Sequence, residues 1–348
     1  MCLFAFLAQL VEHVIYTGSF SVINGCLCSS GGRARWRCKL QPYYMCTSLK
    51  SVTRSVVQVH SQARNLKVVG SNPTEGSKNK DDMKLNTIFN EDCLNTMRAM
   101  PDGVIDLVIT SPPYDDLRNY KGYSFDFESI AKELFRVVKE GGVVVWVVGD
   151  ATVEGSETGT SFRQALFFKE VGFNLHDTMI YMKNNPMPQT GKRYNQCFEY
   201  MFVLSKGTPK TFNPITEETK YKGVANMKNR GKDGSLDYRK MERKNEKKVG
   251  NIFAYSVGGG ISTKDKIAFQ HPAIFPESLV RDHMITWSNE GDLIYDPFMG
   301  SGTTAKISML LNRNWIGSEI STEYVNIANA RLKDTEVEIE RENAVGLW

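Results

Sequence analysis

Several signals that would define the class of this protein are missing from its sequence. The apolar stretch at residues 1–10 is too short to cross a bilayer and no basic segment precedes it, so neither a membrane span nor a secretory signal is indicated. The formal net charge is only +4 over 348 residues, which permits a nucleic-acid partner without requiring one. The hydrophobic content of 41% is enough for a core in one large or two small domains.

Cysteine is scarce after the first 82 residues. Five of the seven cysteines lie before that point: Cys2, Cys26, Cys28, Cys38 and Cys46. The pair Cys26 and Cys28 does not have the usual spacing of zinc ligands, so we predict no metal site. The two remaining cysteines, Cys93 and Cys197, have no partner nearby in sequence, which suits a reducing cytoplasm.

Residues 1–82 also lack a sustained helix or strand periodicity. Two strings in this segment, Ala8–His13 and Val68–Thr74, resemble the D-arm and T-arm of transfer RNA genes translated in frame. We therefore expect residues 1–82 to be poorly structured and to be a misassigned upstream extension, with translation starting at Met83. Peptides from this segment in the native protein would contradict that expectation.

The stretch Ile105–Tyr114 organises the rest of the chain. It begins as a short apolar, β-branched run, which is typical of a buried parallel strand. It ends at Ser111-Pro112-Pro113-Tyr114, where each proline lacks an N–H and pushes the preceding residue toward extended geometry. The carbonyls of Ser111 and Pro112 are then expected to point into a cleft at the carboxyl end of the strand. With the Tyr114 ring they suit an exocyclic amine of an extruded base, although a plain proline-rich turn is the alternative.

A second strand and turn occur at Leu293–Thr304. Gly300 and Gly302 allow a tight turn and let a ligand lie against the backbone. A P-loop would have lysine where Thr303 stands, so nucleotide-triphosphate binding is disfavoured. The next short strand, at residues 315–319, ends in Glu319, placed like the acid that holds ribose hydroxyls in dinucleotide folds.

Together these motifs resemble the amino-methyltransferases of DNA, which modify N4 of cytosine or N6 of adenine. Ser111–Tyr114 matches the catalytic tetrapeptide of that family, and Asp296–Gly302 matches its S-adenosylmethionine loop. The tetrapeptide precedes the loop, as in the permuted β-class order, and the opposite order of glutamine and guanine methyltransferases fits poorly. The resemblance covers residues 83–332. It implies a Rossmann-like α/β fold, with a mixed, mostly parallel seven-stranded sheet, helices on both faces and a small inserted target-recognition region.

The resemblance also assigns site residues. The predicted catalytic residues are Ser111, Pro112, Pro113 and Tyr114. The predicted contacts of S-adenosylmethionine are Asp92, Thr110, Phe275, Asp296, Pro297, Phe298, Gly300, Ser301, Gly302, Thr303 and Glu319. Asp92 is equally suited to cap the helix that follows it. His271, which precedes a proline, is expected to be structural.

Contacts with double-stranded DNA are predicted in three places. Arg118, Tyr120 and Lys121 lie in a polar, aromatic segment read as a loop over the target base, with an ordinary surface loop as the alternative. Lys183 lies beside a predicted wall of the base pocket. Residues 208–268 are predicted to be the inserted target-recognition region, where Lys228, Arg230, Lys232 and Arg239 belong to a basic run that would neutralise phosphates. A solvated charged helix or a flexible insertion is the alternative for that run.

Serine in the first position of the tetrapeptide points, by resemblance, to N4 of cytosine, with N6 of adenine as the alternative. A catalytically silent DNA-binding protein and an RNA amine methyltransferase are further alternatives. We expect a monomeric or homodimeric, bacterial or phage-encoded cytoplasmic enzyme associated with the nucleoid and needing no membrane. A cognate restriction endonuclease is possible, as is a solitary enzyme. After a helix over residues 321–332, residues 333–348 are expected to form a frayed tail.

Overall fold

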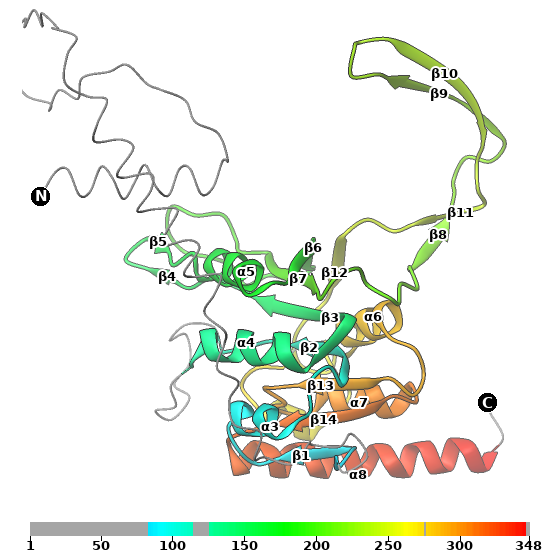
Figure 1. Ribbon diagram of the computed structural model, residues 1–348. Coiled ribbons are helices and arrows are strands. Elements are labelled where there is room, and N and C mark those ends of the chain that lie inside the picture. The colour runs from blue at the N-terminus through cyan, green and yellow to red at the C-terminus, as the bar shows by residue number, and fades with distance from the viewer. Residues whose placement is uncertain (1–82, 114–124, 275, 346–348) are drawn as a thin grey trace, which may run out of the picture. The chain divides into compact units, whose positions relative to one another are not determined.

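The computed structural model describes residues 83–113, 125–274 and 276–345 (Figure 1). The predictions for residues 1–82 therefore lie outside the described part of the chain. So do those for Tyr114, Arg118, Tyr120, Lys121 and Phe275.

A central sheet of eight strands organises the described chain. Its spatial order is β1-β14-β13-β2-β3-β7-β6-β12. The strands are β1 (Thr87–Phe89), β2 (Ile105–Thr110), β3 (Val138–Val148), β6 (Asn174–Lys183), β7 (Phe198–Ser205), β12 (Ile252–Tyr255), β13 (Leu293–Asp296) and β14 (Asn314–Ser318). Only β7 runs antiparallel to its neighbours β3 and β6, and the other adjacent pairs are parallel. The predicted mixed, mostly parallel α/β sheet is confirmed, with eight strands in place of seven.

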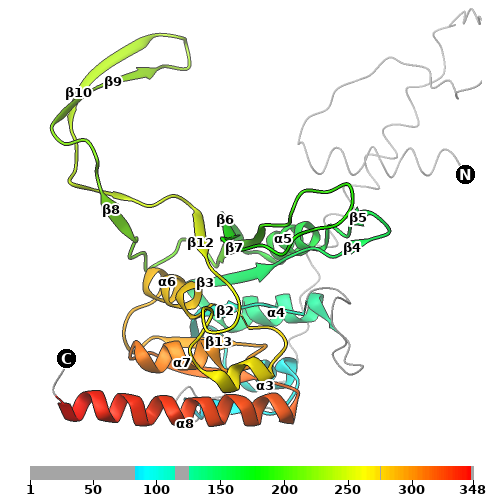
Figure 2. The ribbon, with the colours of Figure 1, turned by 180° about the vertical axis from the view of Figure 1, so that it is seen from behind.

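Helices cover both faces of this sheet (Figures 1 and 2). The core on one face includes side chains from α3 (Cys93–Ala99), α4 (Phe127–Val137) and α5 (Thr160–Val171). The core on the other includes side chains from α6 (Glu277–Trp287), α7 (Thr303–Leu310) and α8 (Thr322–Val345). Strand β3 shows why both faces are buried: Val144, Trp146 and Val148 enter the first core, and the valines between them enter the second. Such two-sided burial explains the continuous apolar runs of β2 and β3.

Helix α4 ends earlier than its sequence pattern predicts. The spacing of Ile130, Leu134, Phe135 and Val138 predicts an amphipathic helix over residues 127–139, with Gly141 at its end. In the structure, α4 ends at Val137, and Val138 already has the extended backbone (φ −71°, ψ 134°) of β3. The Gly141 N–H donates to the Lys206 carbonyl 2.7 Å away, so this glycine lies within β3 and does not terminate the helix.

The predicted insertion, residues 208–268, contains two different kinds of structure. Its exposed part is two small antiparallel pairs: β8 (Thr216–Glu218) with β11 (Glu246–Lys248), and β9 (Val224–Arg230) with β10 (Leu236–Glu242). Its later part is not an insertion, because β12 pairs in parallel with β6 inside the main sheet. The boundary at residue 268 is therefore corrected to a point before β12. The charged-helix alternative is also wrong for the stretch in β9 and β10.

The C-terminal helix runs past the predicted end at Leu332. Helix α8 continues to Val345, so the described part of the predicted tail is helical. One reason lies next to Leu332: the Thr335 side chain is buried and its hydroxyl donates to the Arg331 carbonyl 3.0 Å away. Buried contacts of this kind hold the helix together beyond residue 332.

The described helices include none that combines the length and the apolar character needed to cross a membrane. In the same residues, no group of three or more His, Cys, Asp or Glu side chains is placed to hold a metal ion.

Candidate active site

The topology brings the two sequence motifs to neighbouring positions. β2 and β13 are adjacent parallel strands, with Leu107 opposite Ile294 and Val108 opposite Tyr295. Parallel strands end at the same edge of a sheet. Ser111–Pro113, which follows β2, and the Asp296–Gly302 loop, which follows β13, therefore leave that edge side by side although nearly 200 positions separate them in the chain.

A single carboxylate connects these two segments. Asp296 is buried and accepts hydrogen bonds from the Thr110 hydroxyl (2.7 Å), the Thr304 hydroxyl (2.7 Å) and the Phe298 N–H (3.0 Å). Burial raises the pKa of Asp296, and these three donors oppose that rise. Thr110 and Asp296 were both predicted to contact a cofactor. The structure shows that their side chains contact each other, which fixes the cofactor loop to the strand that carries the tetrapeptide.

The glycine turn after β13 depends on positive backbone angles. Gly300 has φ +52° and Gly302 has φ +81°. A Cβ on Gly300 would lie only 3.1 Å from His271 Nε2, and one on Gly302 would lie 3.1 Å from the Ala328 Cβ. Both positions therefore suit glycine better than any other residue. His271 packs against the turn with its ring buried, which fits the structural role predicted for it.

Glu319 closes the turn from the neighbouring strand β14. One carboxylate oxygen accepts from the Gly300 N–H (2.9 Å) and the other from the Ser321 N–H (2.8 Å). Burial raises the pKa of Glu319, while these backbone donors lower it. A carboxylate oxygen accepts more than one hydrogen bond, so this group keeps acceptor capacity for a bound hydroxyl.

The edge continues to β1, which is paired with β14. The Glu319 N–H donates to the Phe89 carbonyl (3.0 Å), and the Asn90 amide donates to the Glu319 carbonyl (2.9 Å). Asp92 then caps α3 by accepting from the Leu94 N–H (2.8 Å), so the helix-capping role suggested by the sequence is present. The strand order thus places Asp92, Glu319, the Asp296 loop and Ser111 along one edge.

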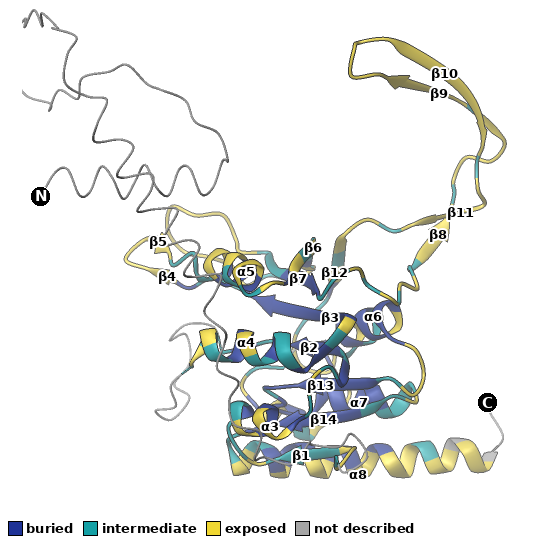
Figure 3. Cartoon of the chain, in the orientation of Figure 1, coloured by how far each residue is buried: buried dark blue, intermediate teal, exposed yellow. Residues whose placement is uncertain are grey.

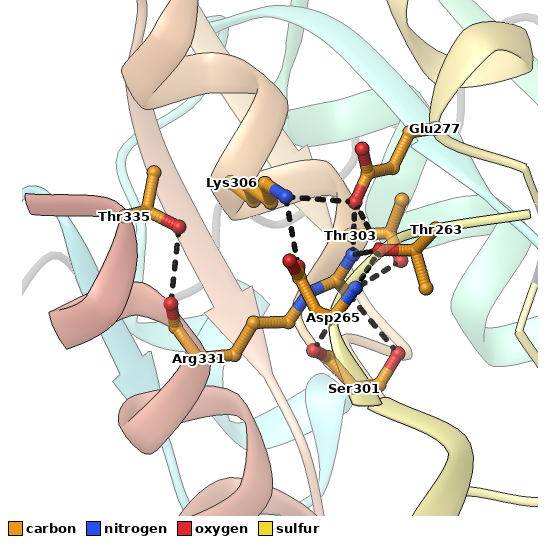
Figure 4. A network of polar contacts seen from close by, with 8 residues as sticks. All are labelled: Thr263, Asp265, Glu277, Ser301, Thr303, Lys306, Arg331 and Thr335. Carbon is orange, nitrogen blue, oxygen red and sulfur yellow. Dashed lines mark hydrogen bonds and ion pairs between the residues drawn. The ribbon is translucent and has the colours of Figure 1, made fainter. Parts of the chain in front are cut away.

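An ionic network behind the glycine turn was missed by sequence reasoning (Figure 4). Arg331 of α8, only 1% exposed, pairs with Asp265 (2.6 Å) and Glu277 (2.6 Å). Lys306 of α7, 7% exposed, pairs with the same two carboxylates at 2.8 and 2.9 Å. Burial alone would raise the pKa of Asp265, but the bonds from Lys306 and Arg331 outweigh it and lower that pKa. The only hint in the sequence was Lys306, the one charged residue of an otherwise uncharged helix.

This network holds two residues that were predicted to bind the cofactor. Arg331 donates to the Ser301 carbonyl (3.1 Å) and to the Thr303 hydroxyl (2.9 Å). Figure 4 shows both residues beside the guanidinium. The Thr303 side chain therefore anchors the turn to α8, and Arg331 is a positioning residue for the turn.

Two further predicted contacts of the cofactor lie in the same loop. Pro297 follows Asp296 directly. The Phe298 ring packs among aromatic side chains, with its centroid 5.7 Å from Phe125 and 6.3 Å from Trp146. This cluster reaches the core under α4 and α5, so Phe298 joins the loop to that face of the sheet.

The predicted DNA-binding residues fall into different environments. Lys183, at the end of β6, forms an ion pair with Glu199 (2.5 Å) that balances its charge within the protein. Lys228 and Arg230 lie on β9, and Lys232 lies in the turn that follows. Arg239 lies on β10 and is bound to Asp237 (2.6 Å). Lys183 therefore belongs to the main sheet, whereas the other four belong to the β9–β10 hairpin.

Comparisons with known proteins decide the family. Residues 105–330 match the N6/N4 methyltransferase model, described as DNA methylase. This chain belongs to the N4-cytosine/N6-adenine DNA methyltransferase family. It is 58% identical over 241 residues to the orphan methyltransferase M.BamHII of Bacillus amyloliquefaciens, covering 67% of this chain and 90% of that protein. It is also 28% identical to the type II methyltransferase M.BglII of Bacillus subtilis, covering 70% of this chain and 68% of that protein.

Among solved structures, the fold resembles that of the PvuII DNA methyltransferase (cytosine-N4-specific). The TM-score is 0.52 at 23% identity, and the match covers 70% of this chain and 84% of that chain. The fold of this DNA methyltransferase is therefore the α/β methyltransferase fold predicted from its motifs.

The methyl donor of this DNA methyltransferase is S-adenosylmethionine. The described residues fit that group. Gly300 and Gly302 give the turn its positive backbone angles and let it pack closely on His271 and Ala328, and Glu319 offers acceptors suited to ribose hydroxyls. Asp92 and the Asp296 loop lie on either side of Glu319 in the strand order.

Proposed function

We propose that this DNA methyltransferase methylates N4 of cytosine in double-stranded DNA, on a base rotated out of the helix. The observation that carries the choice of base is Ser111, which occupies the first position of the catalytic tetrapeptide. Base rotation follows from chemistry, because an exocyclic amine inside the duplex is out of reach of a buried methyl donor.

The proposed mechanism begins with the acceptors of the tetrapeptide. An exocyclic amine is a weak nucleophile because its lone pair is delocalised into the ring. The Ser111 side chain and the Pro112 carbonyl would each accept a hydrogen bond from one N–H group of the amine. These two bonds would turn the nitrogen lone pair out of conjugation with the ring. Pro112 is buried and Ser111 is partly buried, so both acceptors would act where little water competes.

The second element of the mechanism is alignment. When bound, S-adenosylmethionine supplies a methyl group on a positively charged sulfur. The Asp296 carboxylate, bonded to Thr110 next to Ser111 and to the N–H of Phe298 in the cofactor loop, would keep the amine-binding and donor-binding segments in register. Alignment of two reactants can supply about 7–11 kcal/mol of a barrier, so this link is expected to matter for the rate.

Nucleoside mass spectrometry tests the proposal directly. DNA from a methylation-free host that expresses the protein should contain N4-methylcytosine. N6-methyladenine in its place would redirect the proposal to adenine, and the absence of both would reject methyl transfer to DNA. Ser111→Ala should lower the methylation rate by about 10- to 1000-fold, the range expected for a group that acts on the reacting atoms. Ser156→Ala, an exposed serine far along the chain, is the matched control.

We also infer that the enzyme acts without a dedicated restriction endonuclease and in the compartment that holds the DNA. The 58% identical relative is named an orphan methyltransferase, which supports the first point. Deleting the gene in its natural host tests it. If a partner endonuclease cleaved unmethylated sites, deletion of the methyltransferase would expose the host DNA to cleavage and would be lethal or mutagenic. A solitary enzyme should be dispensable for survival.

A further inference from the structure

The ribbon formed by β9 and β10 is exposed along almost its whole length (Figure 3). Seven residue pairs join its strands, from Val224–Glu242 to Arg230–Leu236. A turn at residues 231–235 closes it, where Asp233 accepts from the N–H and the hydroxyl of Ser235 at 3.0 and 2.7 Å. An isolated two-stranded ribbon is only marginally stable in water. Its exposed apolar groups, such as Leu236 and Met241, add nothing to a buried core.

The pairing divides the ribbon into two faces of different character. Residues directly opposite each other share a face, and successive residues alternate between faces. The face that we call the basic face carries Val224, Asn226, Lys228, Arg230, Leu236, Tyr238, Lys240 and Glu242. The face that we call the opposite face carries Ala225, Met227, Asn229, Asp237, Arg239 and Met241.

Charge distinguishes these faces. On the basic face, the three cations Lys228, Arg230 and Lys240 outnumber the one carboxylate, Glu242, which lies two residues from Lys240 at the end of the ribbon. The Lys228 ammonium lies 5.6 Å from the centre of the Tyr238 ring, so a cation and an aromatic plate occur together. On the opposite face, the one cation, Arg239, is neutralised by Asp237 at 2.6 Å. A negatively charged partner is therefore complementary to the basic face.

A second ribbon in the same insertion provides an internal comparison. β8 and β11 pair over three residues each, and there Lys247 is bound to Glu217 (2.8 Å) and Thr216 to Glu246 (2.9 Å). Its charges are thus largely balanced. Farther toward the core, the Asn213 N–H donates to the Thr286 carbonyl of α6 (2.8 Å), which fastens the start of the insertion to the catalytic domain.

We propose that the β9–β10 ribbon enters the major groove of DNA with its basic face toward the base edges. This rests on the proposed function. The major groove is wide enough for a two-stranded ribbon, and it displays the hydrogen-bonding pattern that distinguishes all four base pairs. Lysine and arginine side chains recognise guanine there and asparagine recognises adenine, so Asn226, Lys228, Arg230 and Lys240 determine which sequence is methylated. Lys232, in the turn, contacts the phosphate backbone.

Long-read sequencing of host DNA tests this assignment. The basic-face variant Asn226→Ala/Lys228→Ala/Lys240→Ala is compared with the opposite-face variant Met227→Ala/Asn229→Ala/Met241→Ala in a methylation-free host. We expect the basic-face variant to lose discrimination by about 10- to 100-fold at one or more positions of the methylated sequence, since a lost base contact has that effect. The opposite-face variant should methylate the wild-type sequence at the wild-type rate.

The outcomes separate this inference from the function on which it rests. Absence of methylation by the wild-type protein would reject the function. An unchanged methylated sequence in the basic-face variant would overturn base reading, even if all sites were methylated more slowly, because uniform loss indicates phosphate contacts alone. Equal changes in both variants would also overturn it. Unfolding midpoints are measured for both, and if the triple variant is poorly folded, Asn226→Ala and Lys240→Ala made singly carry the same comparison.

Discussion

At the carboxyl edge of β13 most polar side chains bond inside the protein, whereas along the β9–β10 ribbon almost every side chain meets solvent. Asp296 has three donors around it, and Arg331 is 1% exposed between two carboxylates. By contrast, Tyr238 of the ribbon is 67% exposed. The comparison teaches that the same enzyme separates two tasks. The edge needs fixed geometry for chemistry, and the ribbon needs unsatisfied groups for recognition.

Removing the central carboxylate should have the largest effect on stability. Asp296→Ala leaves the Thr110 and Thr304 hydroxyls and the Phe298 N–H without their acceptor in a buried site. We expect a loss of about 3–5 kcal/mol of unfolding free energy, measured by urea denaturation, together with loss of methyl transfer. Asp296→Asn, which keeps one acceptor oxygen, should lose less. Equal stability of wild type and Asp296→Ala would contradict the link between the two motifs.

Acidification should act on the core and spare the ribbon. His283 of α6 is buried, with Nε2 3.2 Å from the Met201 sulfur, and burial lowers its pKa from 6.5 to about 4. His283 binds a proton at higher pH in the unfolded chain than in the folded chain. The stability that the neutral, buried imidazole allows is therefore fully present above pH 6.5 and is lost as the pH falls toward 4. The loss amounts to about 3 kcal/mol.

His283→Phe provides the control for that pH dependence. The raised pKa values of Asp296 and Glu319 act in the opposite direction in both proteins, so the difference between wild type and variant isolates the histidine. That difference should change by about 3 kcal/mol in favour of the variant between pH 7 and pH 4. A constant difference across this range would show that His283 is not held neutral.

Breaking the ionic network should have a somewhat smaller effect, because a second cation stays in place. Arg331→Met leaves Asp265 and Glu277 paired with Lys306, so we expect a loss of about 2–3 kcal/mol of unfolding free energy. The lost bonds to Ser301 and Thr303 should also raise KM for S-adenosylmethionine more than they lower kcat. Arg331→Lys should restore part of the stability. If Arg331→Met loses the expected stability but its KM for S-adenosylmethionine is unchanged, Arg331 supports the fold without positioning the turn.

Changes in the ribbon should leave stability unaltered. Lys232→Ala removes an exposed side chain of the turn that forms no ion pair among the described residues, so the thermal unfolding midpoint should equal that of wild type. Affinity for DNA should nevertheless become less sensitive to salt, because each lost phosphate contact lowers the slope of log K against log salt by about 0.9. A lower unfolding midpoint would show that the ribbon is part of the cooperative core.

Much of the catalytic part could be predicted because its signals are local. The β-branched run of β2 and the glycines after β13 each impose their own conformation, and their order in the chain matched one family. What escaped prediction depends on distant contacts. Arg331 acquires its role only when α8 packs beside Asp265 and Glu277, which lie more than 50 positions away. β12 is short and preceded by charged residues, so its place beside β6 could not be read from periodicity.

The ribbon was the least predictable element for a related reason. Its residues Val224–Arg230 and Leu236–Glu242 lack the alternation of apolar and polar side chains that marks a half-buried strand, since neither face is buried. The basic composition was visible, but the division into faces required the register. Arg239, grouped with Lys228 and Arg230 by composition, turns out to lie on the other face beside Asp237.

The exposure of β9 and β10 has an evolutionary consequence. Side chains that support no core can be replaced freely, so mutations there would alter the target of the enzyme while its catalytic apparatus stays intact. Lineages could in this way acquire new methylation patterns, and engineers could graft a foreign hairpin between Gly223 and Arg243 to redirect the same scaffold.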